Sequence, residues 1–167
     1  LHEGPAASSQ REQQPGYAAQ VLDRYPIQAG DVLVVASNSG RNAVPIEMAL
    51  TARERGLGTI ALTSLAHSTA FPSRHPSGKR LFEVADVVLD HASVPGDAVL
   101  EIAGLTRRTG ATSTVVGAAL LNALGARAIE LAIAAGHVPE VYASSNADVP
   151  GWNEALLARY RGRLVHL

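Results

Sequence analysis

The sequence predicts an α/β protein built on a parallel sheet, and three observations support this. An apolar, β-branched run at 32–36 and further β-rich runs at 59–64 and 86–91 are separated by helix-like segments. Strands that alternate with helices need crossover connections, and these place the strands parallel. The chain has 167 residues, of which 47% are hydrophobic and 17% charged, so it is large enough for one folded domain with its own core.

The N-terminal part of the chain is expected to hold a loop and one short helix. Residues 1–16 are polar and contain two prolines and two glycines, which is typical of a loop. A helix is expected from Tyr17 to Tyr25, because Pro26 cannot continue it. The run VLVVA at 32–36 follows, and a continuous β-branched run is typical of a strand buried on both faces.

The segment from about Asn42 to Arg55 is expected to be the first long helix. Its apolar residues recur at helical spacing, and Pro45 falls in the first turn, where a missing N–H costs nothing. Gly56 stands where many helices end with a glycine. A strand at 59–64 comes next, so these residues form one strand–helix–strand unit.

The second half of the chain continues the alternation. The expected elements are a polar loop at 66–78, a short helix at 81–85, a strand at 86–91, a helix near 98–108, a long helix at 113–135, a strand or extended arm at 140–145 and a helix at 152–160. The long helix is apolar nearly all round, so we expect it to be buried, either within one subunit or at the seam of a dimer. Asn122, Arg127 and Glu130 make it a poor membrane span.

Composition and charge exclude several classes of function. A net charge of -1 and a pI near 6.7 give no electrostatic basis for binding nucleic acid or an anionic membrane. The chain has no cysteine, which excludes disulfides, thiolate metal sites and a cysteine nucleophile. Residues 1–16 lack the features of a signal peptide, and a soluble cytoplasmic protein is expected. No cofactor is expected, and the spacings of histidine and aspartate match no compact metal motif.

The stretch SNSGRN, residues 37–42, lies between the first strand and the first long helix. Ligands of open parallel sheets bind outside the carboxyl ends of the strands. The helix N-terminus there presents unpaired N–H groups and a partial positive charge, which favour an anion. Ser37, Ser39 and Asn42 add short side-chain donors. Gly40 lets the backbone approach a ligand closely. The stretch matches neither a P-loop nor a dinucleotide fingerprint, and an ordinary helix cap is the alternative.

Two further hydroxyl-rich turns are expected at the same edge of the sheet. TSLAHS (63–68) ends the second strand and offers Ser64, while TGATST (109–114) begins the long helix with Ser113 and Thr114. Each turn alone can be a helix cap or a loop. Together the three turns favour a small polyhydroxylated, phosphorylated ligand.

A recognisable pattern covers the first strand–helix–strand unit, VVASNSGRNAVPIEMALTARERGLGTIALTS. The order strand, Ser-x-Ser-Gly-x-(Thr/Asn), helix, glycine and strand resembles the core of the SIS (sugar isomerase) domain. The wider run LHEG…TSLAHS…SRHPSGKRLFEVADVVLD…PGDAVLEI…STVVGA is similar to an uncharacterised bacterial SIS-domain family. That family is related to phosphoheptose isomerase and to the isomerase domain of glucosamine-6-phosphate synthase.

The resemblance implies a three-layer α/β/α fold around a five-stranded, flavodoxin-like sheet. Residues 1–167 would form a single SIS domain that lacks its native N-terminal strand, and the domain would bind a phosphosugar as a homodimer. By position, Ser37, Ser39 and Asn42 match the phosphate-binding motif, although Asn42 replaces the commoner threonine. Ser113 and Thr114 match a second Ser-Thr pair near the ligand. The expected phosphosugar-binding residues are Ser37, Asn38, Ser39, Gly40, Asn42, Ser64, Ser113 and Thr114.

The residues for acid–base chemistry are sought among histidines and glutamates, because aldose–ketose isomerisation needs a base at the carbon next to the carbonyl and an acid for the oxygens. The catalytic candidates are His67, Glu3 and His2. His67 follows the carboxyl end of a strand, and a surface histidine is the alternative. His2 and Glu3 either stand over the sheet edge or belong to a solvated terminus. His75, His91 and Glu101 are further visible candidates for the acid or the base. His75 lies in a basic loop that either meets a phosphate or faces water.

The expected function is the binding of a phosphorylated sugar. The first hypothesis is an isomerase that works through an enediol, as the resemblance implies. Two alternatives stay open: a module that senses the sugar phosphate without converting it, and an etherase or lyase that eliminates a group from it. The expected partners are the small-molecule phosphosugar and a second copy of the chain, with no nucleic acid and no membrane.

Overall fold

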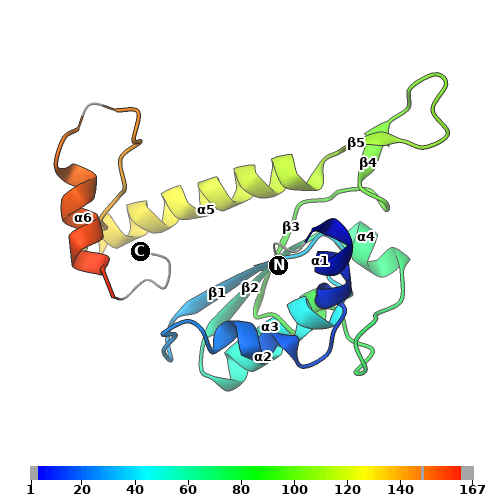
Figure 1. Cartoon of the computed structure of the whole chain (residues 1–167), viewed down its shortest axis with the longest axis horizontal. Helices are drawn as coiled ribbons and strands as arrows, with labels where there is room; N and C mark the ends of the chain where they lie inside the picture. The colour runs from blue at the N-terminus through cyan, green and yellow to red at the C-terminus, as the bar shows by residue number, and fades with distance from the viewer. Residues whose placement is uncertain (1–3, 148, 163–167) are drawn as a thin grey trace.

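The computed structural model describes residues 4–147 and 149–162. Its centre is a three-stranded parallel sheet of β1 (Val32–Ala36), β2 (Gly58–Thr63) and β3 (Val87–Asp90), in the order β1-β2-β3 (Figure 1). The register pairs Val34 with Ile60 and Ile60 with Val87. All three strands lie where the sequence predicted them, to within one residue at each end.

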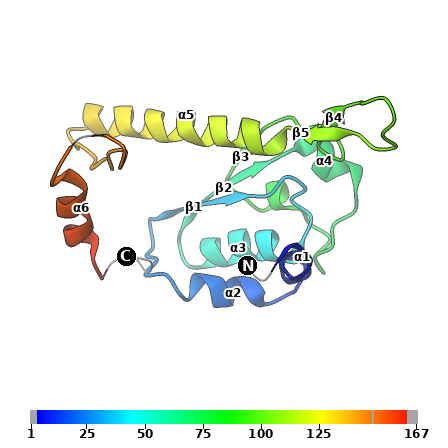
Figure 2. The same ribbon diagram turned by 45° about the horizontal axis from the view of Figure 1, so that its top comes forward.

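Helices α2 (Tyr17–Leu22) and α3 (Ala43–Glu54) cover one face of this sheet, and α5 (Ser113–Ala134) lies on the other side (Figure 2). The predicted three-layer α/β/α class is therefore confirmed. The main core joins the sheet to α3 and to the 3-10 helix η1 (Leu81–Glu83). Its buried residues are Val35, Ile46, Ala49, Ala61, Leu81 and Val84.

The prediction of a loop at 1–16 is wrong, because Pro5–Glu12 form helix α1. Pro5 is compatible with a helix start, since the first turn has no intrahelical partner for its missing N–H. No glycine interrupts the residues that follow, and the side chain of Gln13 donates to the carbonyl of Ser9 at 3.1 Å. The predicted loop at 66–78 likewise begins inside a helix, α4 (Leu65–Ala70).

The helix predicted near 98–108 is also wrong. This segment is an antiparallel ribbon of β4 (Ala98–Leu100) and β5 (Thr109–Ala111). Gly104 has φ 89°, a left-handed value that an α-helix cannot contain, so the chain turns back on itself there. Leu100 covers Gly110 so closely that a Cβ on this glycine would lie 2.8 Å from the leucine side chain.

The C-terminal part ends in helix α6 (Trp152–Tyr160), as predicted. Residues 140–145 form the extended arm and not the strand, since no regular structure is assigned to them. Two contacts hold this arm against α6. The indole N–H of Trp152 donates to the carbonyl of Val141 at 2.9 Å, and the side chain of Asn153 both donates to and accepts from the backbone of Ala143.

Helix α5 is not buried, in contrast to the prediction. Gly117 is its one buried residue, and it packs against Leu62 of β2, whereas Val115 is 72% exposed. Figures 1 and 2 show that α5 runs on past the sheet toward α6. Because α5 meets the sheet only near its first turns, the face of β1 that carries Val32, 60% exposed, stays open. The expectation that β1 is buried on both faces is therefore wrong as well.

By length and composition alone, α5 could cross a membrane. A single helix of this kind is weak evidence for a membrane span. Arg127 and Glu130 form an ion pair on α5 at 2.8 Å.

Candidate functional site

The Ser/Gly turn, residues 37–42, connects β1 to α3 and leaves several backbone donors free. Ser37 donates its N–H to the carbonyl of Leu62 at 2.9 Å, and Gly40 donates to the hydroxyl of Ser37 at 3.2 Å. Within the described part of the chain, the N–H groups of Ser39, Arg41 and Asn42 have no hydrogen-bond partner. Asn42 occupies the N-cap position, but its side chain makes no capping hydrogen bond. The side chain of Asn42 therefore does not cap α3.

A cavity of about 320 Å³ lies between this turn and the first turns of α5. It is lined by Ala36, Ser37, Asn38, Leu62, His91, Ser113, Thr114, Gly117, Ala118 and Leu121. The structure thus brings Ser37 and Asn38 together with Ser113 and Thr114, which are far apart in the sequence. The Oδ1 atom of Asn38 is buried and has no partner among the described residues. An unpaired buried polar atom costs free energy.

Asp97 organises the far wall of the cavity by capping α5. Its carboxylate accepts the N–H groups of Thr112 at 3.1 Å and Ser113 at 2.8 Å, and also the Ser113 hydroxyl at 2.5 Å. Partial burial works to raise the pKa of Asp97, but the hydrogen bonds from Ser113, Thr112 and Ser93 outweigh it and leave the pKa below its ordinary value of 3.8. Asp97 also has φ 66°, a strained value for a residue other than glycine.

The low pKa of Asp97 leads to a prediction about acid stability. A carboxyl whose folded-state pKa is depressed stabilises the fold above its unfolded-state pKa, and this contribution is lost as the pH falls through the folded-state value. Asp97→Asn should therefore lower the free energy of unfolding by about 1 kcal/mol at pH 7, the usual size of an N-cap effect. The difference from wild type should shrink below about pH 4.

Urea denaturation between pH 3 and pH 7 measures this difference. Glu54→Gln is the matched control, because Glu54 is an exposed carboxylate with no hydrogen bond among the described residues. A constant difference between Asp97→Asn and wild type across this pH range would contradict the prediction.

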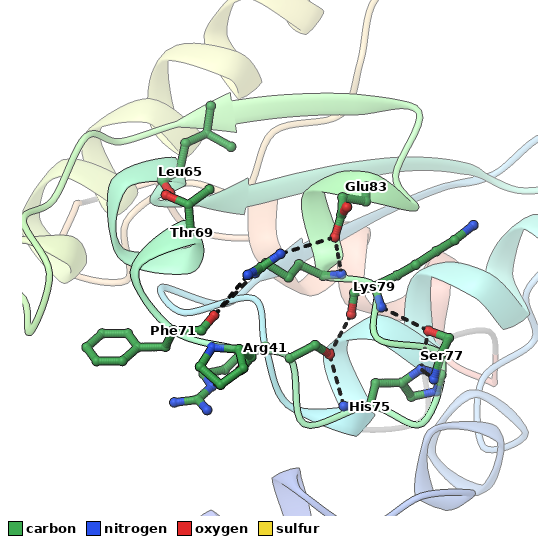
Figure 3. A network of polar contacts seen from close by, with 11 residues as sticks. Arg41, Leu65, Thr69, Phe71, His75, Ser77, Lys79 and Glu83 are labelled. Atoms are coloured by element: carbon green, nitrogen blue, oxygen red, sulfur yellow. Dashed lines mark hydrogen bonds and ion pairs between the residues drawn. The ribbon is translucent and has the colours of Figure 1, made fainter.

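A basic loop, residues 71–80, lies against the other side of the Ser/Gly turn. Arg74 donates its N–H to the carbonyl of Arg41 at 2.8 Å and its Nη1 to Oδ1 of Asn42 at 3.1 Å. Arg41 donates through Nε to the carbonyl of Pro72 at 2.8 Å, and its guanidinium lies 5.5 Å from the centre of the Phe71 ring (Figure 3). Burial, together with the charges of Arg74 and Arg80, lowers the pKa of Arg41.

The basic loop is braced internally by its own polar side chains. Figure 3 shows His75 and Ser77 side by side, with 2.7 Å between Nδ1 and Oγ. The backbone N–H of Arg80 donates to Glu83 at 2.6 Å, and its guanidinium donates to the carbonyl of Phe71. The loop therefore presents a fixed cationic surface next to Asn42, although its side chains do not line the cavity.

Five predicted site residues among those described do not line the cavity: Ser39, Gly40, Asn42, Ser64 and His67. Ser64 is buried and caps α4, where its hydroxyl accepts the N–H of His67 at 3.0 Å and donates to the carbonyl of Ser93 at 2.5 Å. Nδ1 of His67 accepts the N–H of Gly96 at 2.9 Å, and its ring packs against Phe71. His2 and Glu3 lie outside the described residues. The acid–base roles of these three candidates stay predictions.

His91, one of the further acid–base candidates in the sequence, is a cavity residue. It directly follows β3, is 7% exposed and lines the cavity. The signal was present in the sequence, because His91 follows the carboxyl end of a strand just as His67 does. Among the described residues, no group of three or more His, Cys, Asp and Glu side chains is placed to hold a metal ion.

Comparison of the sequence with known proteins shows the family to which the chain belongs. A family model described as the SIS domain matches residues 1–64. A UPF0309 protein of Listeria monocytogenes serotype 4b is 43% identical over 165 residues, which cover 98% of this chain and 67% of the relative. A UPF0309 protein of Brucella canis is 46% identical over 168 residues, 100% of this chain and 68% of the relative. A third, of Geobacillus thermodenitrificans, is 44% identical over 165 residues and matched over 66% of its own length. The chain belongs to the UPF0309 family of SIS-domain proteins.

Proposed function

We propose that this protein binds a phosphorylated sugar between the Ser/Gly turn and the N-terminus of α5. The observation that carries the proposal is the cavity itself, in which Ser37 and Asn38 face Ser113 and Thr114. In this proposal the phosphate lies at the edge of the cavity and accepts hydrogen bonds from the free N–H groups of Ser39, Arg41 and Asn42, which do not themselves line it. The sugar hydroxyls contact the hydroxyls at the start of α5. Membership of a SIS-domain family supports the same ligand class.

The proposed reaction is aldose–ketose isomerisation through an enediol. If the protein is an isomerase, deuterium from D₂O should appear at the carbon next to the carbonyl of the sugar. If it is a binding module, it should bind the sugar phosphate saturably without deuterium uptake. If it is an etherase or lyase, elimination products should form. One incubation of the protein with fructose 6-phosphate, glucosamine 6-phosphate and sedoheptulose 7-phosphate in D₂O, followed by proton NMR, separates the three.

Ser39 is the residue with which we test the phosphate contact. Ser39→Ala should weaken binding of the best of these three phosphates about ten- to hundred-fold, because a hydrogen bond to a charged group contributes about 1.5–3 kcal/mol. Isothermal titration calorimetry on the full-length protein measures the dissociation constant. Ser9→Ala, on the exposed surface of α1, is the control and should bind as wild type does. Equal affinity of both variants would remove the turn from the proposed site.

We further propose that α5 forms the seam of a homodimer in the cytoplasm. Its exposed apolar residues are Val115, Val116, Leu121, Leu131 and Ile133. Exposure of this much apolar surface to water is unfavourable. Packing against α5 of a second copy removes this surface from water.

Leu131 tests the dimer seam, because it is 53% exposed on α5. Leu131→Asp should convert the dimer to a monomer in sedimentation velocity, since burying an unpaired carboxylate costs several kcal/mol. Val138→Asp is the matched control, because Val138 is 82% exposed and lies beyond the end of α5. A dimer that survives Leu131→Asp unchanged would exclude this part of α5 from the seam.

A further inference from the structure

His91 is the one titratable side chain among the described residues that line the cavity. Its backbone N–H donates to the carbonyl of Thr63 at 3.1 Å, which holds it at the end of β3. Ala92 then adopts φ 55°, a left-handed value that is rare for alanine. This bend brings Ser93 back onto the histidine, with 3.0 Å between Ser93 Oγ and His91 Nδ1. Backbone strain of this kind is often kept at functional sites.

A chain of hydrogen bonds links His91 to Asp97. Ser93, which is 3% exposed, lies 3.1 Å from the hydroxyl of Thr112, and Thr112 donates to Oδ1 of Asp97 at 3.2 Å. The contacts therefore run from His91 through Ser93 and Thr112 to the Asp97 carboxylate. We call these four residues the His91 relay.

The direction of each hydrogen bond in the relay follows from counting protons. An ionised carboxylate only accepts, so Asp97 takes the hydroxyl proton of Thr112. Each hydroxyl has a single proton, so the proton of Ser93 goes to Thr112 or directly to the Asp97 carboxylate and is not available to His91. The remaining contact then needs a proton on Nδ1 of His91. A neutral imidazole has one N–H, which leaves Nε2 as the unprotonated nitrogen. No partner for Nε2 occurs among the described residues.

From this geometry we infer that His91 is the acid–base residue of the proposed site, with Ser93, Thr112 and Asp97 as positioning residues that hold its tautomer. The inference rests on the proposed function, since the cavity is the same. A carboxylate that fixes a histidine tautomer through its second nitrogen is a general device of acid–base sites. Here the carboxylate acts through two hydroxyls.

The step assigned to His91 is a proton transfer between two carbons of the sugar. Nε2 takes the proton from the carbon next to the aldehyde, the C–H electrons form the C=C bond, and the carbonyl electrons move to oxygen. The hydroxyl proton on the second carbon moves to that oxygen. The oxygen on that second carbon becomes the ketone oxygen. The C=C electrons then take the proton back from Nε2, and the new C–H bond forms at the former aldehyde carbon. The sugar changes isomer with no net gain or loss of atoms.

The tautomer can be measured without any ligand. In the full-length protein labelled with ¹⁵N-histidine, the ring nitrogens should show a proton on Nδ1 and none on Nε2 of His91 at a pH at which the ring is neutral. Ser93→Ala should release this preference, and Ser93→Thr, which keeps the hydroxyl, should restore it. A proton on Nε2 in the wild type would overturn the relay.

The acid–base role is tested by deuterium uptake into the three sugar phosphates named above. His91→Gln should slow the uptake about 100-fold or more, the usual contribution of a general acid–base group, while the dissociation constant changes little. Ser93→Ala should slow it about ten-fold with unchanged affinity and a shifted pH profile. His137→Gln, an exposed histidine outside the cavity, is the control and should exchange as wild type does.

The outcomes separate the inference from the proposed function. Uptake by His91→Gln at the wild-type rate would overturn the role of His91 and leave the proposed function standing. Wild-type binding without uptake would also overturn it and favour a binding module. If none of the three phosphates binds to wild type, the proposed function fails together with the catalytic role, and the NMR measurement alone decides the relay.

Discussion

Gly40→Ala should lower the free energy of unfolding by about 2–4 kcal/mol, the sum of backbone strain and overpacking in a filled site. Gly40 is buried in the Ser/Gly turn with φ 54°, where alanine is strained. A Cβ there would lie 3.0 Å from Oγ1 of Thr63, 3.2 Å from Cβ of Leu81 and 3.3 Å from Oγ of Ser68. None of these atoms is the end of a long flexible side chain, so the backbone must move.

Gly78→Ala separates strain from crowding and is the matched control. Gly78 has φ 71°, but no atom lies within 4 Å of its hypothetical Cβ. It should therefore lose only the strain contribution, about 1–2 kcal/mol. Urea denaturation of both variants gives the comparison. Equal losses at the two positions would mean that the turn can relax around a methyl group.

Gly40→Ala should also weaken sugar-phosphate binding more than Gly78→Ala does. The displaced backbone belongs to the residues whose N–H groups are free, between Ser39 and Asn42. Calorimetry at a temperature where both variants remain folded measures this effect separately from stability.

The parts of the fold that the sequence predicted well have local signals. The run VLVVA, the proline at position 45 and the glycine at 56 act within a few residues, so β1 and α3 were placed nearly correctly. The wrong helix prediction at 98–108 also has a local cause, which is the left-handed φ of Gly104. A glycine within a helical pattern does not by itself indicate that conformation.

The burial of α5 could not be predicted from its composition. An apolar helix is expected to be covered, but the pattern does not say by which surface. In the described structure only the turn around Gly117 reaches the sheet. The same reasoning explains why the predicted burial of β1 on both faces was wrong. Burial of the face that carries Val32 depends on whether another element packs against it.

The site was predictable where it depends on topology and not where it depends on one backbone angle. Ser37 lies at the carboxyl end of the parallel strand β1, where the general rule places ligand-binding residues. Ser113 follows β5 of the antiparallel ribbon, so that rule does not account for its place beside Ser37. The contact between His91 and Ser93 depends on the left-handed conformation of Ala92, and nothing in the residue type indicates it.

Leu81→Ala should lower the free energy of unfolding by about 3–4 kcal/mol, near the middle of the range for buried leucines. Leu81 is fully buried and packs in the same cluster as Val35 and Ile46. Its removal leaves a hollow beneath the Ser/Gly turn, since its Cβ lies next to Gly40. Leu105→Ala is the control, because Leu105 is 57% exposed, and it should cost less than about 0.5 kcal/mol.

Leu81→Ala and Gly40→Ala should differ in their effect on binding, and this difference tests how the turn is held. The backbone N–H of Leu81 donates to the carbonyl of Gly40 at 2.8 Å, and alanine keeps this bond. Leu81→Ala should therefore lose stability with little loss of sugar-phosphate affinity below its unfolding temperature. A large loss of affinity would mean that the leucine side chain, and not the backbone hydrogen bond, keeps the N–H groups of the turn aimed at the ligand.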